Sequence, residues 1–113
     1  MIAYNENSGV EFLVSFKDTA GNASLPTTVH YRLDCRTTLA TLIDWTSAVP
    51  DVAINSSGVS EVTASLAVPG IANAIQNDRN NREIKTLLVV ADKDLPSEYS
   101  QEYSYVVRNI QGR

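Results

Sequence analysis

The reactive side chains of this 113-residue sequence are few. His30 is the only histidine and Cys35 the only cysteine, so one chain holds neither a pair of histidine metal ligands nor a disulfide. The alternation of residues around them places His30 on the polar face of a strand and Cys35 on its inward face. We therefore expect a surface histidine and a small core residue rather than catalytic groups.

Two groups of carboxylates have the residue types for acid/base chemistry or for a cation site: Asp34, Asp44 and Asp51, and Asp92, Asp94 and Glu98. An acid/base pair needs carboxyl groups held together in an apolar cleft, and the spacing of the first group does not require that. Oxygen ligands on one loop suit Ca²⁺, yet the second group lacks the glycine-bearing pattern of a dedicated calcium loop. We expect solvated carboxylates and predict no catalytic residue, no cofactor and no metal site.

Basic residues are scattered along the chain rather than clustered. The formal net charge is -4, and the nearest approach to a basic patch is Arg79, Arg82 and Lys85, which lie beside Asp78 and Glu83. Such a mixture of signs is typical of a solvated turn. Because phosphate binding needs clustered Lys and Arg, we expect no direct contact with nucleic acid.

Apolar and polar residues alternate over most of the chain, which predicts β-strands. Strands are expected over residues 9–16, 27–36, 60–67, 83–92 and 99–110. The fourth of these is apolar on both faces, which fits a central strand covered on both sides. A less regular segment at 41–46 fits a short strand, with a short helical turn as the alternative.

Turn-forming residues separate the predicted strands. Residues 17–26 combine Asp, Gly, Asn, Ser and Pro, and Gly21 is expected to adopt a positive φ. Residues 51–59 hold one apolar pulse before a Ser-Ser-Gly turn, and residues 71–76 have room for at most one helical turn. The sequence thus predicts an all-β fold: a two-layer antiparallel sandwich of about six to seven strands, as one domain over 9–113, with residues 1–8 as an N-terminal arm or short edge strand.

Two longer stretches resemble known families. The stretch GVEFLVSFKDTAGNASLPTTVHYRLDC, with D-x-x-G-N-x-x-x-P-x-x-V-x-Y-R at its centre, resembles the second and third strands of a fibronectin type III or bacterial immunoglobulin-like domain. The stretch NAIQNDRNNREIKTLLVVADKDLPSEYSQEYSYVVRNIQGR is similar to the last two strands of small immunoglobulin-like proteins found among the virion genes of tailed bacteriophages. In those proteins a Glu opens the penultimate strand and Tyr-x-Val-x-Asn ends the last one, matched here by Glu83 and by Tyr105, Val107 and Asn109.

The resemblance implies an immunoglobulin-like fold and a non-enzymatic structural role in a phage virion, as a capsid decoration or a neck or tail accessory subunit. It implies other virion proteins as partners, a multi-copy or homo-oligomeric arrangement, and synthesis in the host cytoplasm before assembly into the virion. The first strand of the family pattern has to come from only Ile2 to Asn7. If that strand is short or absent, one sheet edge stays open, and an open edge can be extended by a partner strand.

Aromatic residues and the N-terminal edge are the predicted contact surface, because amphipathic aromatics carry much of the energy at protein interfaces. We expect the interface residues Ile2, Tyr4, Trp45 and Tyr99. For Trp45, a core position between two sheets is the alternative. Tyr103 and Tyr105 have the inward phase and are expected to be mostly buried.

Two other functions remain open from the sequence. An adhesive or carbohydrate-binding immunoglobulin-like module on a surface is the first alternative, and a small host-directed inhibitor is the second. The chain start has no basic stretch and no apolar run, so we expect neither a signal peptide nor membrane insertion.

Overall fold

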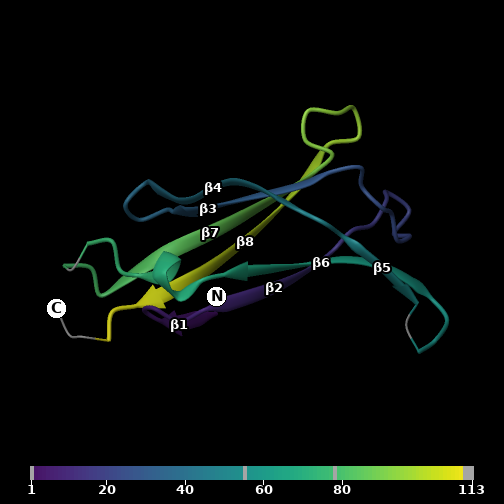
Figure 1. Cartoon of the computed structure of the whole chain (residues 1–113). Helices are drawn as coiled ribbons and strands as arrows, with labels where there is room; N and C mark the ends of the chain where they lie inside the picture. The colour runs from purple at the N-terminus through teal and green to yellow at the C-terminus, as the bar shows by residue number, and fades with distance from the viewer. Residues whose placement is uncertain (1, 55, 78, 111–113) are drawn as a thin grey trace.

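Strands make up most of the chain, as the alternation predicts, and they form two sheets that face each other (Figure 1). The computed structural model describes residues 2–54, 56–77 and 79–110. Its elements are β1 (Ala3–Asn5), β2 (Val10–Ser15), β3 (Val29–Cys35), β4 (Ala40–Ala48), β5 (Asp51–Ile54), β6 (Ser60–Val68), the 3₁₀ turn η1 (Gly70–Asn73), β7 (Arg82–Ala91) and β8 (Tyr99–Arg108). One sheet has the order β1-β8-β7-β3-β4 and the other β2-β6-β5. No helix in the described ranges is long and apolar enough to cross a membrane.

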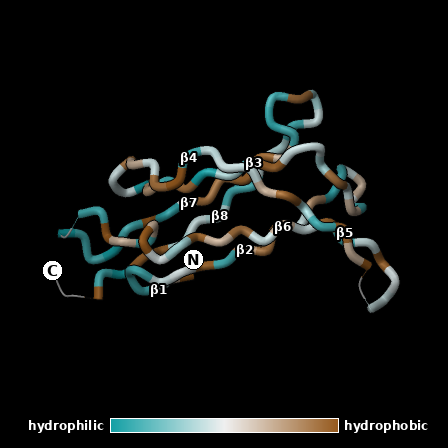
Figure 2. Tube along the Cα trace, in the orientation of Figure 1, coloured by the Kyte–Doolittle hydropathy of each residue, from teal (hydrophilic) through white to brown (hydrophobic). Residues whose placement is uncertain are grey.

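The core lies between the two sheets and is built from the inward phase of the alternating strands. Figure 2 shows hydrophobic and hydrophilic segments alternating along these strands. The buried cluster contains Val10, Val14, Phe16, Val29, Leu33, Val62, Ala64, Leu66, Val68, Leu87, Val89, Ala91, Tyr105 and Val107. Burying a large aliphatic or aromatic side chain of this kind stabilises the fold by about 1.5–3 kcal/mol, so the cluster is the main favourable contribution to folding. Cys35 is fully buried, as expected.

The turn after β2 forms as its residue types predict. The Asp18 side chain accepts hydrogen bonds from the backbone N–H groups of Ala20, at 3.0 Å, and Asn22, at 2.9 Å. Gly21 has a φ of 85°, in the left-handed region that favours glycine. An isolated bridge between Lys17 and Ala23 closes the turn.

The described residues form eight strands rather than six or seven, and the strands are not all antiparallel. β1 pairs with β8 in parallel, with Ala3 opposite Val106. β5 forms where only a short apolar run before a turn was expected. β1 lies within residues 1–8, where a short edge strand was one of the two alternatives. With three and four residues, neither strand is long enough to give a clear alternation, so the pattern left β1 open and did not indicate β5.

β4 is longer than the strand predicted over 41–46. Its pairing with β3 slips twice, between Tyr31 and Leu33 and between Leu33 and Asp34, and each slip inserts an extra residue into β4. The two irregularities bring both Leu42 and Ile43 against the core. They therefore break the period of two that a regular strand shows.

β7 is the middle strand of its sheet, as expected, and its inward face is buried while its outward face is covered only in part. The three-stranded sheet faces only its inward side. On the outward side Thr86 is 4% and Val90 6% exposed, while Ile84 is 37% exposed. Neighbouring side chains on β3 and β8, such as Ser104 with its hydroxyl 2.9 Å from that of Thr86, account for the partial cover.

Candidate protein interface

Trp45 lies on the outer face of the five-stranded sheet and not in the core. It is half-buried, and the core cluster does not include it. The guanidinium carbon of Arg32 and the ammonium nitrogen of Lys93 are each 5.1 Å from the centre of its ring. Two cations near one indole ring stabilise its position through cation–π attraction. Of the two alternatives for Trp45, the structure supports the surface position.

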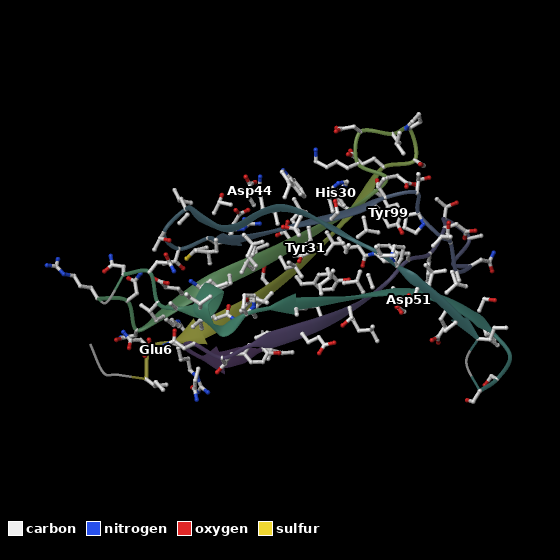
Figure 3. All side chains as sticks on the ribbon, viewed as in Figure 1. Glu6, His30, Tyr31, Asp44, Asp51 and Tyr99 are labelled. Carbon is white, nitrogen blue, oxygen red and sulfur yellow. The ribbon has the colours of Figure 1, made fainter. Side chains whose placement is uncertain are left out.

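Tyr99 begins β8 at the opposite end of the molecule from Glu6 (Figure 3). Its side chain is half-buried against the core. Removal from water raises the pKa of its hydroxyl, since the charged form is disfavoured there. Tyr99 also lines a cavity of about 570 Å³ together with Asp18, Asp92 and Glu98.

Ile2 and Tyr4 lie at the sheet edge formed by β1. Ile2 is 65% exposed, and its carbonyl accepts a hydrogen bond of 2.9 Å from the backbone N–H of Val106. The ring of Tyr4 meets that of Tyr105 edge to face, with centres 5.6 Å apart and planes at 88°. Tyr4 is therefore partly a core residue, while Ile2 is available for contact.

The four predicted interface residues thus occupy three separate places. Trp45 is on the outer face, Tyr99 is at the end formed by loops 17–26 and 92–98, Tyr4 is on β1, and Ile2 comes directly before it. The structure does not bring them into one patch. Which of them contacts a partner stays a prediction.

Glu83 and Lys85 are fully buried, so the expectation of a solvated turn is wrong for both. Their side chains form an ion pair of 3.1 Å. The Glu83 carboxylate also accepts hydrogen bonds from the backbone N–H groups of Gln76 and Asn77, at 2.7 and 2.9 Å, and from the Asn80 side chain at 3.0 Å. Asp78, the other acidic neighbour in the sequence, lies outside the described residues.

The pKa of Glu83 reflects these contacts. Burial raises it, but the hydrogen bonds from Gln76, Asn80 and Asn77 and the contact with Lys85 outweigh burial, and the net pKa lies below its ordinary value. Lys85 additionally donates to the carbonyl oxygen of Ala74 at 3.1 Å. The buried pair therefore fixes the loop before β7 to the sandwich interior.

A second buried polar contact fixes the other side of the same loop. The Tyr105 hydroxyl donates to Oδ1 of Asn73 at 2.6 Å, and Nδ2 of Asn73 donates to the carbonyl of Ser8 at 2.7 Å. The backbone N–H of Asn7 donates to the Asn73 carbonyl at 3.1 Å. Burial raises the pKa of the Tyr105 hydroxyl, so it stays protonated and able to donate.

Asp92 organises the loop at the opposite end, where a calcium site was the alternative. Its carboxylate accepts from the backbone N–H groups of Thr27 and Thr28, at 2.5 and 3.2 Å, and from the Ser97 hydroxyl at 2.7 Å. The Ser97 contact lowers the pKa of Asp92, burial opposes this, and the bonds from Thr28 and Thr27 lower the pKa further. Its oxygens are already hydrogen-bonded, and Glu98 accepts from the backbone N–H of Asp94 at 2.9 Å. Among the described residues, no three His, Cys, Asp or Glu side chains are grouped as metal ligands would be.

The three-stranded sheet has two open edges, because β2 and β5 each pair only with β6. The N–H of Phe16 donates to the carbonyl of Val62 at 2.9 Å, which fixes the phase of the β2–β6 ladder. Antiparallel pairing then directs the backbone groups of Glu11, Leu13 and Ser15 away from β6. By the same phase, the backbone groups of Val52 and Ile54 face the free side of β5.

Each of the two open edges carries exposed apolar side chains among polar ones. Leu13 is 72% exposed on β2, and Val52 and Ile54 are 59% and 71% exposed on β5. The Gln101 side chain donates to the Ser15 carbonyl at 2.9 Å and so blocks one end of the β2 edge. The remaining groups of these edges are available to an added strand.

Comparison with known proteins gives no relative. Neither a family model, nor a curated protein, nor a solved structure matches the chain. The described residues offer backbone donors and acceptors at the two edges of the three-stranded sheet, together with exposed aliphatic side chains and one half-exposed indole. The shortness of residues 2–7 indicated that one sheet edge could stay open but not which one, and the sequence pattern gave no sign of the edge at β5.

Proposed function

We propose that this chain is a non-enzymatic structural protein of a tailed-phage virion, present in many copies as a capsid decoration or a neck or tail accessory subunit. The observation that carries the proposal is the pair of open edges on the three-stranded sheet, with Leu13, Val52 and Ile54 exposed beside unpaired backbone groups. A partner strand added at such an edge gains main-chain hydrogen bonds and apolar contacts together. The phage setting comes from the sequence resemblance of the last two strands.

We propose further that the fold is immunoglobulin-like. The order β2-β6-β5 is that of strands B, E and D in such domains, and β8-β7-β3-β4 is that of strands G, F, C and C′. β1 then adds beside strand G, in the sheet opposite β2. In this assignment no strand occupies the position next to B, which is the reason for the open edge at β2.

Contacts of this kind are small for one copy. A single added strand buries less surface than the roughly 800 Å² per partner of a standard stable interface. Many copies on one particle make up for this, because each contact raises the effective concentration for the next. The proposed role is therefore reinforcement of a repeating surface rather than tight one-to-one binding.

The test uses particles of the phage that encodes the chain, purified from a mutant phage in which the gene for this chain is deleted. The proposal expects saturable co-sedimentation of the purified chain with these particles, and the chain itself in wild-type virions by mass spectrometry. A chain that is absent from virions and fails to co-sediment contradicts the proposal.

Two variants at one position separate edge pairing from apolar contact. Leu13→Pro removes the N–H that faces the open side of β2, and at this position, opposite Ser65, the backbone groups form no hydrogen bond of the β2–β6 ladder. Leu13→Thr keeps the N–H and the strand propensity but removes the aliphatic surface. Strand addition at β2 predicts that Leu13→Pro loses binding while Leu13→Thr keeps most of it. Thermal unfolding of both variants checks that the sandwich is intact.

A second candidate is a surface-displayed carbohydrate-binding or adhesion module, favoured by the position of Trp45 on the outer face. Sugar rings stack on exposed indoles, and β-sheet faces are common platforms for this. Arg32 and Lys93 already contact the Trp45 ring, which leaves less of it for a ligand. A glycan array on which Trp45→Ala changes no signal would set this candidate aside.

A further inference from the structure

Arg82 and Arg108 stand directly opposite each other on adjacent strands, although they lie far apart in the sequence. They are register partners where β7 begins and β8 ends. Both side chains are exposed. Directly opposed residues of an antiparallel pair have their Cβ atoms about 5 Å apart, so two like charges here repel. Within the described ranges, neither guanidinium forms an ion pair with a carboxylate.

The opposite end of the molecule is acidic. Its loops, 17–26 and 92–98, carry the exposed carboxylates of Asp18, Asp94 and Glu98, of which that of Asp94 forms an ion pair of 3.3 Å with Lys93. Asp18, Glu98 and the buried Asp92 line the cavity of about 570 Å³, against one cation, Lys17. Tyr99 forms an aromatic wall of this cavity. A guanidinium is the cation best suited to such a place, because it binds carboxylates through two parallel hydrogen bonds and stacks on aromatic rings.

The two sets of charges therefore lie in different parts of the molecule. The chain measures 49 × 33 × 20 Å, and Figure 1 shows the start of β7 and the end of β8 at one extremity, with loop 92–98 in the other half of the molecule, above the β5–β6 hairpin. At physiological salt the Debye length is about 8 Å, so the two ends do not interact within one molecule. They can interact only when the end of one molecule meets the opposite end of another.

We infer that copies of this chain associate head to tail, with Arg82 and Arg108 of one copy entering the cavity lined by Asp18, Glu98 and Tyr99 of the next. The contact joins two different surfaces, so it repeats and generates rings or open chains rather than closed dimers. The cross-section of 33 × 20 Å is smaller than the roughly 800 Å² per partner of a stable interface, so each contact is weak and salt-sensitive. The inference is independent of the proposed virion role, since it concerns the isolated chain.

The test measures the weight-average mass of the full chain by sedimentation at rising concentration. At an ionic strength of about 10 mM, where the Debye length is about 30 Å, the mass is expected to rise with concentration. At about 1 M, where the Debye length is about 3 Å, the chain is expected to be a monomer. A monomer at low salt, or association that survives high salt, overturns the inference.

A charge swap identifies the surfaces. The double variant Arg82→Glu/Arg108→Glu and the single variant Glu98→Arg are each expected to associate less than the wild type at low salt. Mixing the two variants is expected to restore association, because each then meets an end of opposite charge. A change in net charge alone cannot restore association in the mixture. A mixture that stays monomeric overturns the assignment of these surfaces.

Two controls complete the experiment. Thermal unfolding checks that both variants fold, and Arg82→Glu alone is expected to raise the unfolding temperature because it converts the repelling pair into an attracting one. An electrophoretic shift with duplex DNA tests the other anion that an arginine pair fits. The inference would be overturned if the wild type shifts the DNA, Arg82→Glu/Arg108→Glu does not, and the wild type is a monomer at low salt. The arginine pair would then be assigned to phosphate binding.

Discussion

The hydroxyl of Tyr105 and the side-chain amide of Asn73 meet in the interior of the protein, at a hydrogen bond of 2.6 Å. Tyr105 is 1% exposed and Asn73 is fully buried. Through the other end of the amide, which donates to the Ser8 carbonyl at 2.7 Å, this contact joins β8 and η1 to the link between β1 and β2. One asparagine therefore holds together three segments that are distant in the sequence.

Tyr105→Phe is expected to lower the free energy of unfolding by about 1–3 kcal/mol, because it leaves a buried acceptor on Asn73 without its donor. Urea denaturation followed by tryptophan fluorescence measures the change. Tyr4→Phe is the matched control, since it removes a hydroxyl from the ring that contacts Tyr105, and its effect is expected to stay within about 0.5 kcal/mol. Equal losses in the two variants would contradict the role given to the Tyr105 hydroxyl.

Stability is expected to depend on pH through Glu83. Its pKa is lower in the folded protein than in the unfolded chain, so the folded state binds fewer protons. Its contribution is therefore present above the unfolded-state pKa and is lost as the pH falls through the folded-state pKa. Denaturant titrations from about pH 7 down to about pH 3 are expected to show this acid-side loss.

Glu83→Gln is expected to remove that pH dependence and to cost about 3–5 kcal/mol at neutral pH, since Lys85 is then buried without a counter-charge. Glu102→Gln is the control: it breaks the exposed pair with Arg36 and is expected to cost at most about 1 kcal/mol. If Glu83→Gln still lost stability at acid pH to the same extent as the wild type, another carboxylate would be the cause of that loss.

Gly70 is expected to tolerate no side chain. A Cβ there would lie 2.4 Å from the backbone carbonyl oxygen of Asn7, so η1 and the β1–β2 link would have to move apart. Gly70→Ala is expected to lower the free energy of unfolding by about 1–3 kcal/mol, as overpacking does elsewhere. Gly9→Ala, whose Cβ would meet its nearest atom at 3.7 Å, is expected to be neutral or slightly stabilising. A thermal shift assay of both variants shows whether the cost comes from the close approach of Gly70 to Asn7 or from alanine at either glycine.

Gly21→Val tests the turn after β2 in a different way. A Cβ at Gly21 would have no heavy atom within 4 Å, so any cost comes from its φ of 85° and not from a clash. We expect a loss of about 1–2 kcal/mol. Gly21→Asn should lose less, because asparagine adopts the left-handed region more readily. Equal stability of Gly21→Val and wild type, by urea denaturation, would contradict the backbone argument.

The sequence was informative wherever a strand was long and regular. Alternation placed Cys35 of β3 and Tyr105 of β8 in the core, and both are buried. It left β1 as one of two alternatives and did not indicate β5, since three or four residues fit too many patterns, and irregular pairing hid the full length of β4. The alternation of apolar and polar residues predicts burial only where buried and exposed positions alternate regularly over several residues.

The polar interior and the candidate surfaces depend on partners that are distant in the sequence. Glu83 and Lys85 looked like part of a solvated turn because their own neighbours are charged, and only the enclosing loop 74–80 buries them. Arg82 and Arg108 become opposite each other only through the register of β7 and β8. Trp45 could not be assigned to a face, because β4 is irregular where it lies.

The parallel pairing of β1 with β8 also bears on how long the folded state lasts. Ala3 meets Val106, so this pair closes a loop of nearly the whole chain, and the entropic cost of closure rises with loop length. We expect this pair to form late in folding, because closing so long a loop is costly, and a contact that is absent from the transition state slows unfolding without speeding folding. The three residues of β1 are therefore expected to prolong the lifetime of the native state and to leave the folding rate unchanged.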